Sequence, residues 1–153
     1  MESVQLVVFH LSGVEYAVTI DQVQEIINVA EITRVPRAPS FILGVFNLRG
    51  KVLPAIDLKQ RLSLGVTTVG ETSRLVVVKV GEHVAGLLVD GVSETTLVER
   101  GQIEPASVMM GSVSQDLVEG IVKLGDRLLT WLNLDRVLAK SGEETVEAER
   151  QVG

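Results

Sequence analysis

The side chains that could carry out catalysis are few in this sequence, and they are not spaced for it. His10 and His83 are the only imidazoles, and the chain has no cysteine. The two histidines fall in different places of two predicted hairpins, without the His-x-x-x-His spacing that suits a metal. The sequence also lacks the motifs of serine hydrolases, P-loops and dinucleotide-binding turns. We therefore expect no metal site and no cofactor.

Four aspartates could in principle pair as a general acid and a general base. They are Asp21, Asp57, Asp90 and Asp126. Each stands where a turn or the start of a helix favours aspartate, because its carboxylate can accept hydrogen bonds from nearby backbone N–H groups. The structural role is the simpler interpretation, and we predict that the protein is not an enzyme.

Arg49 is the charged side chain with the most informative position, between Leu48 and Gly50 in a predicted turn. One interpretation is an ordinary solvated loop arginine. The other is a binding residue, whose planar donors hold a partner's carboxylate or backbone carbonyls in a way that lysine cannot imitate. The spacing alone leaves both interpretations open.

Two apolar segments could form a binding surface. Residues 23–29 read Val-Gln-Glu-Ile-Ile-Asn-Val, and residues 103–110 contain Val108, Met109 and Met110 in a longer connection. Contiguous exposed apolar surface usually marks a site for a partner, and methionine adapts easily to one. Burial of these segments between two packed parts of the fold would explain their apolar character equally well.

Short β-strands must position these residues. The chain has 153 residues, of which 27 are valine, and valine favours strands through its branched Cβ. Asp57 and Asn133 follow two of the predicted strands as N-caps of helical segments. Turn signals separate four pairs of apolar runs, which we predict as hairpins: 4–11 with 14–20, 41–48 with 51–56, 75–80 with 83–89, and 118–124 with 127–132.

The pattern is repeated along the chain. One constant offset in residue number, which we call the first offset, maps Leu6-Val7-Val8 onto Leu75-Val76-Val77, and the segment 21–25 onto 90–94. A slightly larger second offset maps Gly44, Leu48, Leu53, Leu58 and Leu62 onto Gly120, Leu124, Leu129, Leu134 and Leu138. Two blocks of matching residues that follow each other in the same order indicate an internal duplication of the chain. Small antiparallel sheets avoid exposed edges by closing, so we expect two small barrels packed together.

Charge and hydropathy exclude several classes of partner. The formal net charge is −6, which argues against binding to nucleic acid or to an anionic membrane. No apolar run reaches the length of a membrane span, and the first residues lack the features of a secretory signal, so we expect a cytoplasmic protein without direct membrane insertion. Residues 141–153 contain four Glu and one Arg, and we expect a disordered acidic tail there.

Several segments of the sequence resemble the CheW family, the coupling proteins that join chemoreceptors to the chemotaxis histidine kinase. The resemblance covers about residues 4 to 140. Asn-Leu-Arg-Gly followed closely by Pro-x-x-Asp-Leu is its most specific part. The segments that carry it are Val23-Gln24-Glu25-Ile26, residues 39–50 (PSFILGVFNLRG), residues 53–58 (LPAIDL), residues 86–92 (GLLVDGV) and residues 120–138.

The resemblance implies a mainly β fold without catalysis. It implies one CheW-like domain over residues 1–140, built of two tandem SH3-like five-stranded β-barrels with a shared core and a short C-terminal helix. The expected subdomains are intertwined and comprise about 14–72 and about 4–13 plus 73–140. The implied function is an adaptor that is recruited to membrane-bound receptor arrays.

The resemblance also implies two binding sites. The cytoplasmic tip of a methyl-accepting chemoreceptor, a helical hairpin, would bind between the barrels, and the regulatory domain of the histidine kinase would contact one barrel. Glu104, Pro105 and Met109 match a segment that can meet the kinase, although Glu104 stands where a basic residue can occur. The residues that match the receptor side are Val23, Glu25, Ile26, Gly44, Asn47, Arg49, Gly50 and Val92.

Two other functions fit the sequence. A small-molecule sensor could use the groove between the barrels as a ligand pocket. The chain could also be the coupling half of a regulator that carries a phosphoacceptor receiver domain, although the sequence ends at Gly153 without one. Thermal shift against a metabolite panel would reveal a sensor, since a specific ligand raises the melting temperature.

Overall fold

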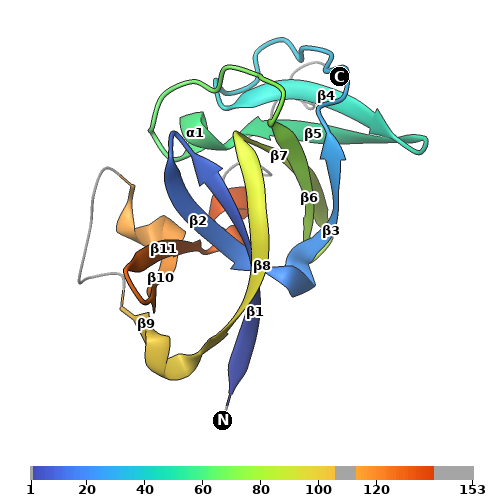
Figure 1. The fold of residues 1–153 in the computed structure, drawn as a ribbon. Coiled ribbons are helices and arrows are strands. Elements are labelled where there is room, and N and C mark those ends of the chain that lie inside the picture. The colour runs from blue at the N-terminus through green and yellow to red at the C-terminus, as the bar shows by residue number, and fades with distance from the viewer. Residues whose placement is uncertain (1, 106–112, 140–153) are drawn as a thin grey trace.

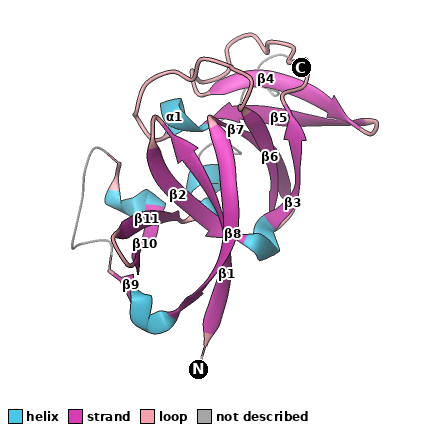
Figure 2. Cartoon of the chain, viewed as in Figure 1, coloured by secondary structure: helices cyan, strands magenta, loops and turns pink. Residues whose placement is uncertain are grey.

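The computed structural model describes residues 2–105 and 113–139, and strands dominate these ranges (Figures 1 and 2). The strands form two sheets, each curled around its own interior. In order across the five-stranded sheet lie β3 (Val23–Asn28), β6 (Arg74–Val80), β7 (His83–Val89), β5 (Lys51–Asp57) and β4 (Ile42–Leu48). In order across the six-stranded sheet lie β8 (Gly91–Glu99), β1 (Ser3–Leu11), β2 (Val14–Thr19), β11 (Arg127–Leu132), β10 (Val118–Leu124) and the short β9 (Ile103–Glu104).

Helices are short and lie at the ends of strands. The helix α1 (Leu58–Arg61) begins at Asp57, whose carboxylate accepts a hydrogen bond from the Lys59 N–H. Residues 134–139 are helical, and the Asn133 side chain accepts from the Arg136 N–H. Both predicted N-caps are therefore confirmed. No helix among the described residues has the length and apolar character needed to cross a membrane. Within the same ranges, 3-10 turns lie at Ile20–Gln22, Arg100–Gln102 and Gln115–Leu117.

All four predicted hairpins form, and the turn at Arg49 has an uncommon backbone geometry. Arg49 and Gly50 are the two loop residues between β4 and β5, and their φ angles are 52° and 86°. Positive φ at both positions defines a type I′ turn, whose twist matches that of the paired strands. Arg49 thus adopts a left-handed backbone, which is uncommon for a residue with a side chain.

The strand pairing repeats with the sequence, and this confirms the duplication. Ala55 pairs with Gly86 in the parallel pair β5–β7, and Trp131 pairs with Ala17 in the parallel pair β11–β2. The first offset maps Ala17 onto Gly86, and the second maps Ala55 onto Trp131, so the two pairs are equivalent. The irregularity between Val8 and Phe9 against β8 likewise recurs in the pairing of β3 with β6.

Each barrel takes its strands from both copies. The hairpin β1–β2 belongs to the first copy but pairs with β8 and β11, and the hairpin β6–β7 belongs to the second copy but pairs with β3 and β5. The strands therefore group as 23–89 and as 3–19 with 91–132. The predicted division at 14–72 differs from this grouping in two places, because it separates β1 from β2, which a tight turn pairs, and it assigns β6 and β7 to the other subdomain. The tail at 141–153 lies outside the described residues.

Three apolar clusters fill the described part of the molecule. Alternate residues of β1 serve two of them: Leu6 and Val8 face the interior of the six-stranded barrel, and Val7 and Phe9 face the other barrel. The five-stranded barrel has an interior of its own around Phe46. The shared core between the barrels is the largest cluster and includes Val7, Phe9, Leu11, Tyr16, Val18, Ile56, Leu58, Val76, Val78, Leu87, Leu132 and Val137. The predicted pair of SH3-like barrels with a shared core is confirmed.

The exchange of hairpins predicts that neither half folds alone. We expect fragments 1–72 and 73–140 each to lack a cooperative unfolding transition, because each barrel would lose two central strands. Mixing the two fragments should restore dispersed amide NMR signals, since all the pairings are then available in trans. A cooperative transition in either isolated fragment would contradict this expectation, and would show that the fragment's own hairpin can replace the exchanged one. The intact chain is the reference.

Candidate functional site

The five-stranded barrel closes at Gly44, one of the predicted receptor-side residues. The chain beyond β3 returns to β4, where Thr33 and Val45 exchange two backbone hydrogen bonds of 2.8 Å. Gly44 is buried beside this contact, with a φ of 149°. A Cβ atom at Gly44 would lie 2.0 Å from the carbonyl oxygen of Thr33. The closure therefore requires glycine, and this requirement gives Gly44 a structural role in positioning β3 against β4.

Arg49 and Glu25 form an ion pair across the closed barrel. Both guanidinium NH₂ groups of Arg49 donate to Glu25, one to each carboxylate oxygen, and the Nη2–Oε1 distance is 2.9 Å. The two residues lie near the opposite edges of the sheet, since β3 and β4 are its first and last strands. They meet because the sheet curls. The predicted receptor-side residues Glu25 and Arg49 are thus brought together directly.

The Arg49 side chain remains 73% exposed in this pair. Hydrogen bonding to Glu25 raises the pKa of Arg49 above its ordinary value, so the guanidinium stays charged. Asn47 supports the turn, because its Oδ1 accepts from the N–H of Gly50 at 3.0 Å. The turn thus presents a fixed, charged and solvent-facing group. This geometry favours the binding interpretation of Arg49 over an unattached loop side chain.

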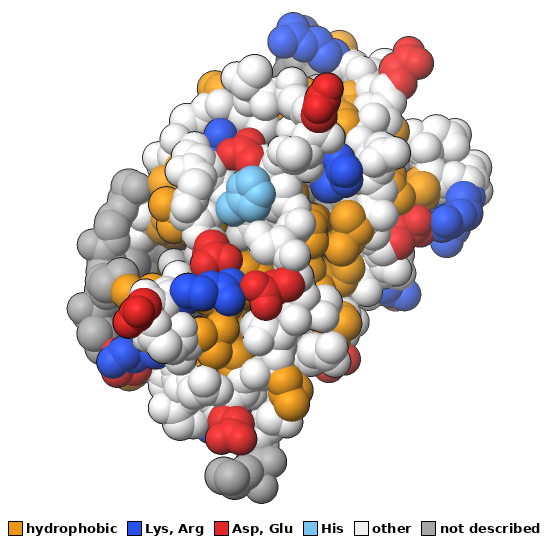
Figure 3. All heavy atoms as spheres, viewed as in Figure 1, with side chains coloured by type: hydrophobic (Ala, Val, Ile, Leu, Met, Phe, Trp, Pro, Cys, Tyr) orange, Lys and Arg blue, Asp and Glu red, His pale blue; other side chains and the backbone are white. Residues whose placement is uncertain are grey.

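An apolar surface lies between the barrels, and we call its residues Val23, Ile26 and Val92 the inter-barrel strip. Val23 and Val92 are half-buried against the shared core. Ile26 lies opposite Val76, a residue of that core, so it faces the same way, and it is 41% exposed. Figure 3 shows hydrophobic side chains gathered between the positions of β8 and β3. Three predicted receptor-side residues therefore share one surface.

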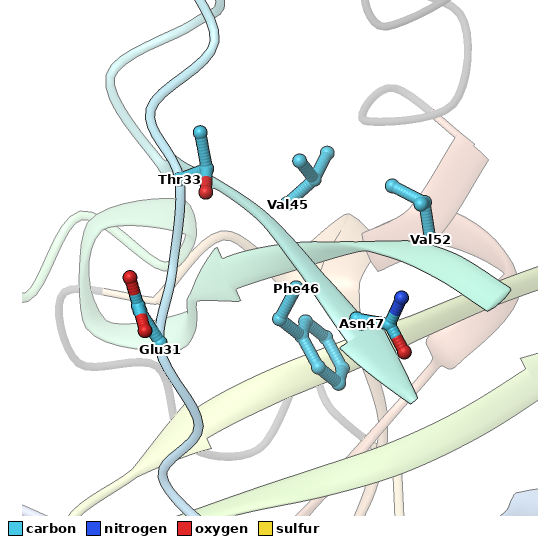
Figure 4. A pocket seen from close by; sticks show the side chains of 6 residues that line it. All are labelled: Glu31, Thr33, Val45, Phe46, Asn47 and Val52. Carbon is cyan, nitrogen blue, oxygen red and sulfur yellow. The ribbon is translucent and has the colours of Figure 1, made fainter. Parts of the chain in front are cut away.

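A hollow beside the barrel seam is a feature that sequence reasoning missed. Its volume is about 250 Å³, and Figure 4 shows its lining side chains. Val52 at its rim is 65% exposed. The hollow depends on the contact between Thr33 and β4, and the connection 29–41 carries no periodic signal for that contact. In the sequence, the only indication that the barrel closes here was the repetition of Gly44 as Gly120 in the second copy. The lining residues are Glu31, Thr33, Val45, Phe46, Asn47 and Val52.

Two of the predicted kinase-side residues, Glu104 and Pro105, lie at the β9 edge of the six-stranded sheet. Glu104 belongs to β9, which pairs with β10, and its carboxylate lies 3.3 Å from the Lys123 Nζ. Pro105 follows as an exposed residue, and Met109 lies outside the described residues. Ile103 is partly buried and packs against the interior of the six-stranded barrel. The start of the apolar segment 103–110 thus contributes to a core.

Two of the four aspartates expected to be structural, Asp57 and Asp90, have structural partners. Asp57 is buried and accepts hydrogen bonds from both the N–H and the hydroxyl of Thr67, at 2.9 and 2.6 Å. Asp90 accepts from the Ser12 N–H at 2.6 Å and lies 3.0 Å from the Lys59 Nζ, so it ties α1 to the β1–β2 turn. Among the residues that the structure describes, no group of three or more His, Asp or Glu side chains could hold a metal.

Asp90 predicts a dependence of stability on pH. Burial alone would raise its pKa, but the hydrogen bonds from Ser12 and Lys59 outweigh burial, and the pKa of Asp90 is lowered. A lowered pKa gives stability that is present above the ordinary carboxyl pKa of about 4 and is lost as the pH falls through the folded-state value. Asp90→Asn should therefore be less stable than the wild type at pH 7, and the difference should shrink below about pH 4.

Urea unfolding between pH 7 and pH 3 measures this difference. Asp126→Asn, at an exposed turn position, is the matched control and should follow the wild type throughout. A difference between Asp90→Asn and wild type that stays constant down to pH 3 would contradict the role given to the Asp90 carboxylate.

Comparison with known proteins agrees with this geometry. The family model described as "CheW-like domain" matches residues 5–142. A chemotaxis protein CheW of Helicobacter pylori is 34% identical over 139 residues, which are 91% of this chain and 84% of that protein. CheW of Bacillus subtilis is 33% identical over 141 residues, 92% of this chain and 90% of that protein.

A solved structure is similar over nearly the whole fold. The crystal structure of the scaffolding protein TtCheW from Thermoanaerobacter tengcongensis matches with a TM-score of 0.85 and 34% identity, over 95% of this chain and 94% of the other. Members of this family are non-catalytic scaffold proteins of chemotaxis. The duplicated pair of barrels, the Asn47-Leu48-Arg49-Gly50 turn and these matches together show that the chain belongs to the CheW family of chemotaxis scaffold proteins.

Proposed function

We propose that this scaffold protein couples chemoreceptors to the chemotaxis histidine kinase. The observation that carries the proposal lies on β3, which contributes Val23 and Ile26 to the inter-barrel strip and, between them, Glu25, the partner of Arg49. The strip offers apolar contact and the arginine offers a directional charge. A cytoplasmic protein of this kind would be recruited to membrane-bound receptor arrays through its partner.

The receptor partner is the cytoplasmic tip of a methyl-accepting chemoreceptor, a helical hairpin. An amphipathic helix binds by laying its apolar stripe into an apolar surface, and Val23, Ile26 and Val92 provide such a surface. Arg49 then contacts a carboxylate or a helix C-terminus of the tip through its exposed guanidinium. Gly44, Asn47 and Gly50 support the site by holding the turn and the barrel seam in place.

The kinase partner is its regulatory domain, which is expected to resemble this chain. We place this contact at Glu104, Pro105 and Met109, on the six-stranded barrel and its following connection. Head-to-tail contacts between similar barrels close into rings when the rotation between neighbours allows it. The protein would then act as a spacer in mixed rings, while the inter-barrel strip of each copy stays available to a receptor.

NMR titration of the labelled chain with a receptor-tip fragment tests the receptor site. Chemical-shift changes should cluster at residues 23–26, at 44–50 and around Val92. Changes confined to β10 and β11, or none at millimolar fragment, would contradict the site. Val14 is exposed beside the β1–β2 turn and offers a control, because Val14→Ala should leave binding unchanged.

Analytical ultracentrifugation with the isolated kinase regulatory domain tests the second contact. We expect a complex whose size grows with concentration, as ring-forming head-to-tail contacts require. Met109→Glu should weaken that complex and leave receptor-tip binding unchanged, because the proposal assigns Met109 to the kinase contact alone. Absence of any complex at accessible concentrations would contradict the proposed coupling function.

A further inference from the structure

The inter-barrel strip has two flanks that the duplication makes equivalent. The first offset maps Glu25 on β3 onto Glu94 on β8. Glu25 lies opposite Val77 inside the five-stranded barrel, and Glu94 lies opposite Val8 inside the six-stranded barrel. Each glutamate therefore sits on the inner face of its own barrel. Glu25 is next to the strip residue Ile26 along β3, and Glu94 is close to the strip residue Val92 along β8.

Both glutamates bind an arginine, but the two arginines come from different positions. Arg49 lies in the β4–β5 turn, and the second offset maps it onto Gly125. The partner of Glu94 is Arg127, at the start of β11, at 2.9 Å. Arg127 also donates two hydrogen bonds to Glu15, at 3.0 and 2.8 Å. The second flank is thus built from one arginine and two carboxylates.

This difference makes the two flanks electrostatically unequal. Arg49 pairs with a single carboxylate among the described residues, so its flank is neutral and its guanidinium is 73% exposed. Arg127 is shared by two carboxylates, which leaves one net negative charge, and the Glu94 side chain is 43% exposed. The hydrogen bond from Arg127 lowers the pKa of Glu15, so this carboxylate remains ionised at neutral pH.

Because the duplication makes the two flanks equivalent in position, the direction in which a ligand binds between them needs an explanation. An antiparallel helical hairpin is itself nearly two-fold symmetric, so it could lie across the strip in either of two opposite directions. Contact with Val23 and Val92 would not separate the two directions, because the first offset makes these residues equivalent, whereas Ile26 corresponds to Thr95 and has no apolar counterpart. Discrimination between two binding modes comes from a favourable contact in one, from an unfavourable contact in the other, or from both.

We propose that Glu15, Glu94 and Arg127 form an orientation-determining surface for the receptor hairpin, and this rests on the function proposed above. An acidic side chain of the hairpin is attracted to the exposed Arg49 and is repelled by the net negative second flank. The reverse direction would place that acidic side chain beside Glu94. The flanks therefore favour one direction by their charges, which the equivalent residues Val23 and Val92 cannot do.

Paramagnetic broadening measures the direction of binding. A nitroxide is placed on one helix of a receptor-tip hairpin through a single cysteine, and the scaffold chain, which has no cysteine, is isotopically labelled. Amide signals are compared at two equivalent turns, Arg49–Gly50 and Gly125–Asp126. In the wild type, broadening at one turn should exceed broadening at the other by about fivefold or more, since one direction dominates.

The decisive variant is Glu15→Gln with Glu94→Gln, which frees Arg127 to bind an acid. Both turns should then broaden to within about twofold of each other, because both flanks attract the hairpin. Glu94→Gln alone keeps the Glu15–Arg127 pair and should shift the ratio in the same direction, so it serves if the double variant does not fold. Glu119→Gln, an exposed site on β10, makes the same charge change and should keep the wild-type ratio.

The outcomes separate this proposal from the one it rests on. Equal broadening of both turns in the wild type, or one-sided broadening that survives in the double variant, would overturn the orientation role while leaving receptor binding in place. If the wild type shows neither broadening nor shift changes with the hairpin, the receptor-binding proposal itself is overturned, and this one with it.

Discussion

Gly44→Ala is expected to lower the free energy of unfolding by about 3 kcal/mol or more, which is a loss of about 10 °C in melting temperature for a chain of this size. The added Cβ would lie 2.0 Å from the Thr33 carbonyl oxygen and 2.6 Å from its carbonyl carbon. Both are backbone atoms, so no side chain can rotate away. The φ of 149° adds strain for any residue with a Cβ. Relief therefore requires the barrel to open at its seam.

Differential scanning calorimetry and amide exchange at Thr33 and Val45 measure the effect. Gly101→Ala is the control, because a Cβ there meets no atom within 4 Å, and its stability should change little. Gly120→Ala should fall between the two, since its nearest contact is the Cγ2 of the Ile103 side chain at 2.9 Å. A Gly44→Ala protein as stable as Gly101→Ala would show that the seam can shift without cost.

Local features of this fold could be predicted from the sequence. Strand alternation, tight turns and the N-caps Asp57 and Asn133 each depend on residues that are neighbours in the chain. The duplication was also visible, because strands and caps repeat in order. Even the identity of Gly44 and Gly120 as a repeated pair was evident, although not its reason. These signals are short in range, and a sequence displays them directly.

Features that depend on distant residues could not be predicted from residue patterns. The exchange of hairpins between the copies changes no local pattern, because β1–β2 and β6–β7 have equivalent sequences and equivalent registers. Glu25 and Arg49 meet only after the sheet curls and closes. The third partner of the second flank, Glu15, comes from a strand far before Arg127 in the chain. Non-local contacts of this kind have no signal in a single sequence.

Arg49→Glu is the second change expected to have a large effect, here on binding. Affinity for the receptor tip should fall by about tenfold or more, because a charge-assisted contact is replaced by repulsion from the partner and from Glu25. The melting temperature should change little, since exposed ion pairs contribute little to stability. Isothermal titration calorimetry and thermal unfolding measure the two quantities. Arg100→Glu reverses the charge of another exposed arginine and is the control.

The charge-swapped double variant, Glu25→Arg with Arg49→Glu, separates two roles of the pair. It restores an ion pair across the barrel seam but presents a carboxylate where the wild type presents a guanidinium. If the pair serves only to hold β3 against the β4–β5 turn, the swap should recover receptor binding. If Arg49 itself contacts the receptor, binding should stay as weak as in Arg49→Glu, because the partner meets the wrong charge. We expect the second result, since the Arg49 side chain is 73% exposed and Glu25 leaves much of it available to a partner.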